Sequence, residues 1–362
     1  MVYIFYFALL IIGALLTDSR ASGKQYLFVI MLFLFVIIGF RDTTVGTDTL
    51  GYTEDYARFA SMSFSEMWHY SFTTKEPLYV IISWLPSVFS THYTAFLLTW
   101  ALFPVVSLYK VFKKELEGSK DIMIAMLVFF LLGLFAFYVA GIRQTAALSL
   151  VFFGAKYLKD LSWNGWRGFI FNKHLLVFLL TIGIAYLIHN SSVLFVIAIP
   201  CLFFKVRFWY LFFVFGLVFI GDYVQIDQIV FLSKYFFADR FATYGTVYES
   251  SQNMSAFIMQ VILFLFCFAV KGKLVERDSQ NNFYFNMMFF GLVFQSLSGM
   301  MAEMSRISFY FCMFAMLLVP RAFKEYPKKY RGLLYTVFTG TCLYYLFFLT
   351  KSNLPTYNYT LF

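Results

Sequence analysis

Apolar runs alternate with short polar segments along almost the whole chain, and this alternation limits the folds that the chain can adopt. Of the 362 residues, 61% are hydrophobic and 13% are charged, and the mean hydropathy is +0.74. The segments without an apolar run reach roughly 30 to 40 residues, which is too few for an independently folding soluble domain. We therefore expect one all-α integral membrane domain over residues 1–362. A cytosolic nucleotide-sugar enzyme, an ATPase head and a DNA-binding domain are excluded.

Twelve apolar runs are candidates to cross a membrane, because about 20 residues, or somewhat fewer with interfacial aromatics, span ~30 Å of hydrocarbon. They are residues 2–17, 25–40, 93–112, 122–141, 144–158, 173–189, 191–204, 207–222, 254–270, 283–302, 306–320 and 331–349. The run 77–89 is shorter and contains Pro86, so we interpret it as a re-entrant or half-membrane helix. If it were counted as a full crossing, the basic cluster Lys110–Lys120 would lie outside the membrane, whereas basic loops are expected on the cytoplasmic side. The expected protein is polytopic, with about 12 transmembrane helices.

Basic residues are concentrated in the loops on one side of these crossings. Of the 28 lysines and arginines, 20 lie in those loops, and positive charge is retained in the cytoplasm during insertion. Both termini are therefore predicted to face outward. No lysine or arginine precedes the run 2–16, which we interpret as a retained first helix and not a signal peptide. The net charge of +9 does not indicate nucleic-acid binding, because the charges are not gathered on one face.

The sequence contains no common motif for a metal ion or a nucleotide. Its four cysteines lie inside apolar runs without metal-ligand or redox spacing, and its four histidines form no H-E-x-x-H pair. Neither a P-loop nor a GxGxxG motif occurs. We therefore expect no metal site and no cofactor. The alternative is an ion shared by Asp42 and Asp48, whose spacing permits it.

Four outward arginines lie at or near the outer ends of apolar runs: Arg41, Arg143, Arg240 and Arg306. Arg41 lies in the string G-F-R-D-T-T-V-G-T-D-T-L-G-Y over residues 39–52. The glycines, threonines and aspartates of this string suit a tight loop whose amides and hydroxyls face an anion or a sugar. The alternative is an interfacial arginine that reaches the lipid headgroups beside a capping aspartate.

Arg143 and His189 lie in two tight outward turns. Arg143, in A-G-I-R-Q-T-A-A, opens a helix whose N-terminus offers unpaired amides and a partial positive charge. The helix dipole disfavours a structural arginine there, so we predict a phosphate site. His189, in L-I-H-N-S-S, can act as base, acid or phosphate donor. Alternatively, it caps the helix C-terminus and is satisfied by Ser191 or Ser192.

Two further outward segments carry charged residues. Glu303 and Arg306 are spaced to share one helical face, where either a substrate contact or an internal salt bridge is possible. The loop Asp222–Asn253 contains Arg240 and Tyr244 among aromatic residues, which suit either sugar rings or an interfacial helix on the lipid. Together with segment 41–76, the loop 222–253 is expected to contribute to an outer-face cavity.

Several of these motifs, taken in order, carry a resemblance to a known family. They are the string at 39–52, E-P-L-Y at Glu76–Tyr79, G-I-R-Q-T-A-A at Gly141–Ala147, the H-N-S-S turn and E-M-S-R-I-S-F-Y-F. Together they resemble the EpsG family of Wzy-type bacterial polysaccharide polymerases, whose products include capsule, exopolysaccharide and O-antigen. The resemblance implies a GT-C-like glycosyltransferase on the outer face of the cytoplasmic membrane. Such an enzyme transfers a growing glycan from undecaprenyl pyrophosphate to a lipid-linked repeat unit.

The outward position and chemistry of these residues, together with the resemblance, give their expected roles and the expected partners. The expected catalytic residues are Arg41, Asp48, Glu76, Arg143 and His189, and the expected substrate-binding residues are Asp42, Tyr52, Gln144, Arg240, Tyr244, Glu303 and Arg306. Asp48 and Glu76 are the first candidates for the base that activates the acceptor hydroxyl, before His189 and Glu303. The expected partners are undecaprenyl-pyrophosphate-linked oligosaccharides, membrane lipids, and a chain-length regulator and flippase of the same pathway, without nucleic acid.

Two other functions remain open at this point. A flippase or transporter of the lipid-linked oligosaccharide would require broken helices and charges near mid-membrane, whereas here the charged residues lie at one face. A membrane O-acetyltransferase acting on the polysaccharide would also use an arginine-rich site, but it needs a route for an acyl donor from the cytoplasm.

Overall fold

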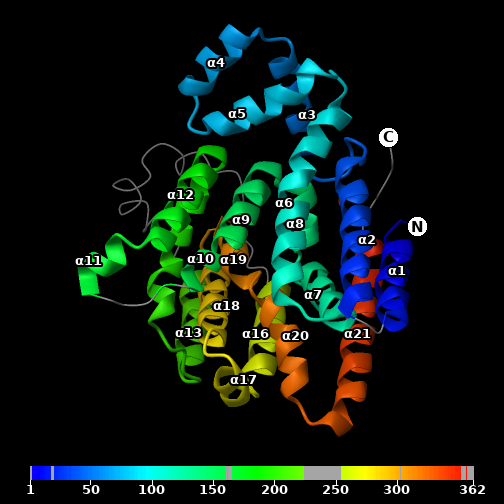
Figure 1. The fold of residues 1–362 in the computed structure, drawn as a ribbon, viewed down its shortest axis with the longest axis vertical. Coiled ribbons are helices and arrows are strands. Elements are labelled where there is room, and N and C mark those ends of the chain that lie inside the picture. The colour runs from blue at the N-terminus through cyan, green and yellow to red at the C-terminus, as the bar shows by residue number, and fades with distance from the viewer. Residues whose placement is uncertain are drawn as a thin grey trace.

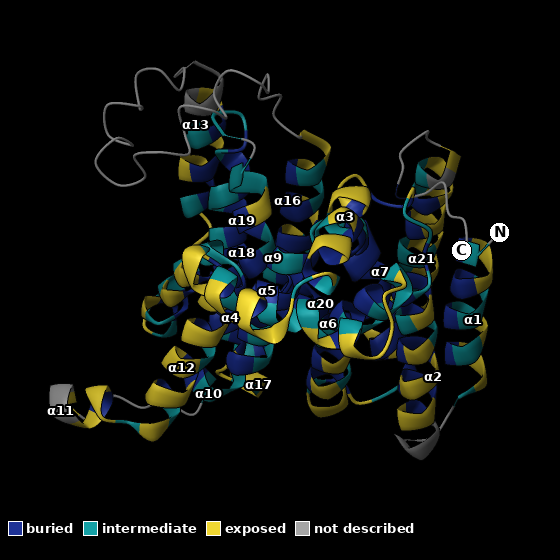
Figure 2. Cartoon of the chain, turned by 90° about the horizontal axis from the view of Figure 1, so that it is seen from above, coloured by how far each residue is buried: buried dark blue, intermediate teal, exposed yellow. Residues whose placement is uncertain are grey.

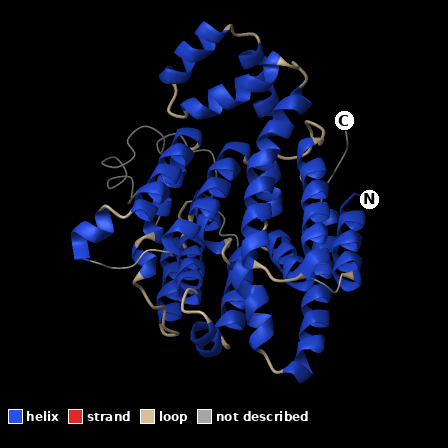
Figure 3. Cartoon of the chain, in the orientation of Figure 1, coloured by secondary structure: helices blue, strands red, loops and turns tan. Residues whose placement is uncertain are grey.

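The computed structural model describes residues 2–17, 20–159, 161, 165–223, 254–301, 303–351 and 356. These residues form helices joined by turns, and no strand is found among them (Figures 1 and 3). The all-α class predicted from composition is therefore confirmed for the part of the chain that is described.

The apolar runs of the sequence coincide with helical segments. The principal helices are α1 (Val2–Leu16), α2 (Arg20–Gly39), α6 (Tyr93–Glu115), α7 (Ser119–Leu131), α8 (Leu134–Ala140), α9 (Ile142–Gly154), α12 (Lys173–Ile188), α13 (Tyr210–Tyr223), α16 (Met254–Phe268), α18 (Asn281–Ser296), α19 (Glu303–Cys312), α20 (Ala315–Glu325) and α21 (Lys328–Lys351). The short helices α10 (Lys156–Lys159), α11 (Gly165–Ile170) and α17 (Lys271–Arg277) lie between them.

Several runs that the sequence presents as continuous are broken in the structure. Within the runs 122–141 and 306–320 the chain bends by 64° between α7 and α8 and by 48° between α19 and α20, and it bends by 63° between α16 and α17, where the run 254–270 ends. Gly133 adopts φ +74° at the first of these bends, a conformation that costs a residue with a Cβ atom roughly 1–2 kcal/mol. The run 191–204 forms two 3₁₀ helices, η2 (Asn190–Ala198) and η3 (Pro200–Leu202), and not an α-helix.

Counting helices that are long enough to cross a membrane gives fewer crossings than counting apolar runs in the sequence. Among the described residues, two helices are long and apolar enough to cross a membrane, Tyr93–Glu115 and Lys328–Leu349. The number rises to five if each bent pair is counted as one span. The other apolar helices have 10–17 residues, because turns, bends and 3₁₀ segments interrupt the runs. Twelve crossings and a GT-C-like architecture therefore remain predictions.

Three helices from the polar segment 41–76 and the run 77–89 lie together beyond one end of the bundle, and we call them the cap (Figure 1). They are α3 (Thr49–Ala60), α4 (Phe64–Thr73) and α5 (Pro77–Trp84), followed by the 3₁₀ helix η1 (Leu85–Val88). A capping box of Ser63 and Glu66 starts α4, and Pro77 at the first turn starts α5. The segment predicted to be a re-entrant or half-membrane helix thus packs with the cap.

Burial separates the central helices from the peripheral ones (Figure 2). All residues of α7 except Lys120 are buried. In contrast, α12, α13 and α21 expose large apolar side chains, including Leu180, Phe212 and Tyr344. An exposed apolar surface of this extent is typical of helices that face lipid.

Candidate functional site

A pocket of about 150 Å³ lies where the cap meets the N-terminal end of α9. It is lined by Asp55, Arg58, Phe59, Tyr70, Thr74, Lys75, Glu76, Tyr79, Val80 and Arg143. The residues come from α3, α4, α5, the α4–α5 connection and the first turn of α9. Three cations and two carboxylates line it, so its charge favours an anionic ligand.

Glu76 joins three segments that are distant in the sequence. Its Oε2 atom accepts a hydrogen bond from Nη1 of Arg143 at 2.6 Å, and its Oε1 atom accepts one from the backbone N–H of Asn190 at 3.3 Å. Nδ1 of His189 lies 2.8 Å from Oε1, although its N–H is poorly aligned with the carboxylate, so we treat this contact as electrostatic. The Glu76 side chain is 6% exposed. Three of the predicted catalytic residues therefore lie together.

Local structure explains how these three residues reach one another. Glu76 precedes Pro77 at the start of α5, Arg143 is in the first turn of α9 after Gly141, and His189 ends α12. Each of the three side chains is thus held at a helix terminus. A shift of that terminus by one residue would point the side chain in a different direction. The helices meet because α12 packs on both α9 and α5.

The ionisation of Glu76 is set by opposing effects. Burial raises its pKa, but His189, Arg143 and the N–H of Asn190 together outweigh burial and hold the pKa of Glu76 below its ordinary value. Glu76 is therefore an anion near neutral pH. Because its oxygens are occupied and its side chain is almost inaccessible, it positions its partners and is poorly placed to take a proton from a substrate.

The guanidinium of Arg143 is also oriented by two aromatic rings. Its central carbon lies 4.9 Å from the ring centroid of Tyr79 and 5.6 Å from that of Tyr52. Burial raises the pKa of Tyr52, and the positive charge of Arg143 beside it acts in the opposite direction. The Arg143 side chain is still 37% exposed. It can therefore contact a ligand without leaving its partners.

Sequence reasoning missed several residues of the pocket. Asp55 accepts a hydrogen bond from Nη2 of Arg58 at 2.7 Å and another from the hydroxyl of Tyr79 at 3.1 Å. Lys75 is exposed and forms no ion pair among the described residues. The available signal was the helical spacing of Asp55 and Arg58, which share one face of α3. It was missed because segment 41–76 was interpreted as a loop.

Arg41 lies away from this pocket. It is 1% exposed, and it donates hydrogen bonds to the carbonyl oxygens of Val139, at 2.8 Å, and Ile38, and to Oγ1 of Thr49. These contacts tie the end of α2 to α3 and α8. They favour a structural role for an arginine that we expected to be catalytic.

Asp42 and Asp48, the two aspartates of the segment 39–52 that contains Arg41, do not line the pocket. Asp42 accepts hydrogen bonds from the N–H and the hydroxyl of Thr44, which lower its pKa below the ordinary value. Asp48 is exposed at the N-cap position of α3, where its side chain makes no capping hydrogen bond. No group of three metal-ligating side chains is found within the described residues.

The remaining predicted substrate-binding residues divide into two groups. Gln144 donates a hydrogen bond to the carbonyl oxygen of Arg306 at 3.3 Å, which joins α9 to α19 near the site. Glu303 and Arg306, both described, form no ion pair with each other, and Arg306 is exposed. Arg240 and Tyr244 lie outside the described residues, as does most of the loop 222–253.

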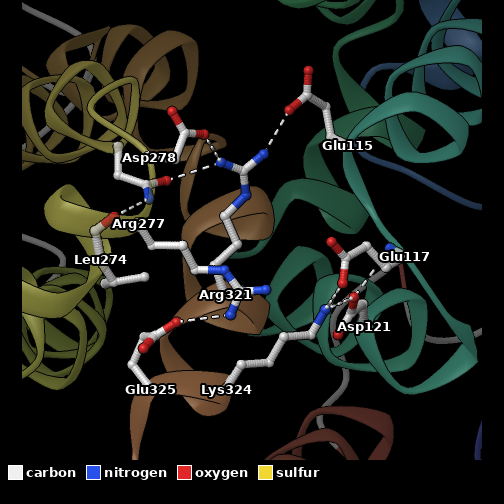
Figure 4. A pocket seen from close by; sticks show the side chains of 10 residues that line it. Glu115, Glu117, Asp121, Leu274, Arg277, Asp278, Arg321, Lys324 and Glu325 are labelled. Atoms are coloured by element: carbon white, nitrogen blue, oxygen red, sulfur yellow. Dashed lines mark hydrogen bonds and ion pairs between the residues drawn. The ribbon is translucent and has the colours of Figure 1, made fainter.

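A second polar cavity, of about 230 Å³, lies at the opposite end of the bundle (Figure 4). Glu115 accepts from Nη2 of Arg321 and Nζ of Lys159, both at 2.7 Å, and Lys324 lies 2.7 Å from Asp121. Five carboxylates and three cations line this cavity, and the carboxylates are all engaged in ion pairs. The excess of carboxylates disfavours an anionic ligand. We therefore place the candidate site at the cap.

Fold and site together define a membrane protein that is helical over the described residues, with a pocket at one end that is lined by aromatic rings and by more cations than carboxylates. The model of the EpsG family matches residues 24–361, almost the whole chain. The chain therefore belongs to the EpsG family, a family of Wzy-like polysaccharide polymerase-type proteins. This membership makes it a polysaccharide-related membrane protein of a family associated with glycosyltransferase-like polymerases. No curated protein and no solved structure matches the chain.

Proposed function

We propose that this protein is a membrane glycosyltransferase that polymerises a lipid-linked glycan at the outer face of the bacterial cytoplasmic membrane. The growing glycan leaves undecaprenyl pyrophosphate and is joined to a lipid-linked repeat unit. The observation that most supports the proposal is Arg143, which Glu76 and Tyr79 hold in a pocket with more cations than carboxylates.

The chemistry of the donor accounts for the kind of site required. A lipid pyrophosphate carries the bond energy itself, so the reaction needs no nucleotide, and its leaving group is strongly anionic. Nη1 of Arg143 contacts Glu76, which leaves other N–H groups of the guanidinium for phosphate oxygens. Lys75 supplies a second positive charge at the pocket. When it is protonated, His189 adds positive charge beside Glu76, which favours the departing pyrophosphate electrostatically although His189 does not line the pocket.

The proposal extends to topology and pathway. Both termini face outward, about twelve helices cross the membrane in a GT-C-like arrangement with one further short re-entrant or half-membrane helix, and the pocket opens toward the outer leaflet. The product is a capsule, exopolysaccharide or O-antigen chain. A chain-length regulator and a flippase of the same pathway are the proposed partners.

Purified protein in lipid nanodiscs tests the activity directly. The substrate is the undecaprenyl-pyrophosphate-linked repeat unit extracted from the producing strain after deletion of this gene. We expect products of two or more repeat units, and we expect the same products in excess chelator, since no metal is proposed. Products that disappear with chelator and return with Mg²⁺ would implicate Asp42 and Asp48 in a metal site.

Two other results would replace the proposed function. If the protein in lipid vesicles moves the lipid-linked unit from one leaflet to the other and makes no longer products, it is a flippase. Acetylated products of unchanged length, formed in the presence of an acyl donor, would identify an O-acetyltransferase.

A further inference from the structure

We infer that Asp55 is the general base that accepts the proton of the acceptor hydroxyl, an inference that rests on the proposed glycosyl transfer. Asp55 lines the same pocket as Arg143, and its side chain is 36% exposed. The pocket therefore contains both a cation for the leaving group and an accessible carboxylate for the nucleophile.

The carboxylate of Asp55 is oriented but not saturated. Its Oδ1 atom accepts from Nη2 of Arg58, and its Oδ2 atom accepts from the hydroxyl of Tyr79. A carboxylate has about four lone-pair sites, so two of them remain for a substrate hydroxyl. Tyr79 is buried, which fixes the direction of its hydroxyl and thereby the rotamer of Asp55.

Tyr79 also sets the position of Asp55 relative to the leaving group. Its hydroxyl contacts Asp55, and its ring lies 4.9 Å below the guanidinium of Arg143. One side chain thus contacts both the proposed base and the proposed pyrophosphate ligand. A pyrophosphate bound by Arg143 and an acceptor hydroxyl bound by Asp55 would therefore both lie beside Tyr79 in one pocket.

The other acidic and basic candidates fit this role less well. Both oxygens of Glu76 are occupied, and its side chain is 6% exposed. His189 shares the Glu76 carboxylate with Arg143 and does not line the pocket. Asp48 is exposed on the surface of the cap and does not line the pocket either.

The transfer balances with this assignment. The acceptor O–H bond breaks and its proton passes to the Asp55 carboxylate, while the oxygen forms a bond to the anomeric carbon of the donor. The bond between that carbon and the pyrophosphate oxygen breaks, and its electron pair leaves with undecaprenyl pyrophosphate. Asp55 then releases the proton to the external water, which restores the carboxylate.

Asp55→Asn tests the assignment, because it keeps the shape and the contact with Tyr79 but removes the basic group. In nanodiscs, we expect the rate of polymerisation to fall by about 10²–10⁴. Binding of the undecaprenyl-pyrophosphate-linked repeat unit should change less than about threefold, since the Arg143 site is intact. Glu54→Gln, an exposed substitution on the same helix outside the pocket, should leave the rate unchanged.

Arg58→Gln separates the base from its ion pair. If Asp55 acts on the acceptor, loss of its exposed partner lowers the rate by less than about tenfold. If Arg58→Gln and Asp55→Asn lowered the rate of polymerisation equally, the inference would be overturned, because the ion pair would then have only a structural role. Normal turnover in Asp55→Asn would overturn it too. Failure of the wild-type protein to make any longer product would instead reject the proposed function itself.

Discussion

Arg143 is constrained in two independent ways, by a carboxylate at one edge of its guanidinium and by aromatic rings across its face. Glu76 accepts from Nη1, and the rings of Tyr79 and Tyr52 lie 4.9 and 5.6 Å from the central carbon. A planar group held at its edge and its face has a defined orientation, which an ammonium on a flexible stem does not reproduce. The geometry of the cation, and not its charge alone, should therefore matter for activity.

Replacing Arg143 by lysine should be nearly as damaging as replacing it by alanine. We expect both variants to lose about 3 kcal/mol of transition-state stabilisation, roughly a hundredfold in rate. The measurement is the rate of polymer formation in nanodiscs, at protein amounts matched by quantitative blotting. Glu54→Gln serves as the control on the cap. Wild-type chain length in Arg143→Lys would show that the arginine has a structural role.

Glu76 should make stability depend on pH in the acidic range. Its pKa is lowered in the folded protein, so its contribution is complete above the ordinary carboxyl value of 4.5 and is lost as the pH falls through the lowered pKa. Melting curves in detergent should therefore show a gap in melting temperature between wild type and Glu76→Gln that is widest above about pH 5 and narrows as the pH falls further. A gap that does not change with pH would contradict the ionic role of Glu76.

At the scale of helices, charged side chains are gathered at both ends of the bundle. At the end opposite the cap, Glu115 at the last turn of α6 binds Lys159 of α10, Arg321 of α20 and the hydroxyl of Tyr284 of α18. The cations also stack on the Tyr284 ring, at 4.6 and 5.1 Å. One carboxylate therefore joins four helices.

Removing that carboxylate should destabilise the bundle. Glu115→Gln removes the carboxylate that pairs with Lys159 and leaves Arg321 with Asp278, and the side chains of Glu115 and Lys159 are 9% and 7% exposed. Loss of one member of a buried pair costs about 3–5 kcal/mol, which should lower the melting temperature by several degrees. Glu117→Gln, two residues away, is the matched control, because Glu117 is 65% exposed and its pair contributes about 1 kcal/mol at most. Equal melting temperatures for the two variants would contradict the joining role of Glu115.

At the scale of the whole molecule, the cap and the cavity of ion pairs mark opposite ends (Figure 1). The basic loops at Lys110–Lys120, Lys271–Arg277 and Arg321–Arg331 belong to the end opposite the cap. The positive-inside rule predicts that these loops are cytoplasmic and that the cap and its pocket face outward.

Labelling of intact cells tests this orientation. In a background in which the four buried cysteines are replaced, an impermeant maleimide should label a cysteine at Ser61, on the cap, and should not label one at Lys114. Both positions are exposed, so burial does not explain a difference. Permeabilised cells provide the control, in which both positions should react. Labelling of position 114 alone in intact cells would reverse the topology and remove the outer-face site.

Part of the site could be predicted from single motifs, and part could not. Glu76, Arg143 and His189 were each identified from a local feature, namely a residue before proline, a helix N-terminus and a helix C-terminus. Asp55 was not, because its importance depends on Tyr79, 24 residues away, and on the pocket that the cap encloses. Arg41, like Arg143, is an arginine at the end of an apolar run, but packing directs it to backbone carbonyls.

The sequence alone was sufficient to predict a helical membrane protein and to locate most of its helices, because hydropathy and helix-ending residues act over a few neighbouring positions. Breaks within apolar runs escaped it, since a bend at Gly133 depends on how α7 and α8 pack. Only the tertiary structure decided which charged termini meet. Glu76 and Arg143 are 67 residues apart, and any of several carboxylates could have paired with this arginine by charge alone. Packing of α12 against α9 and α5 selects one of them, because ion pairs of this kind require specific distances and exclusion of water.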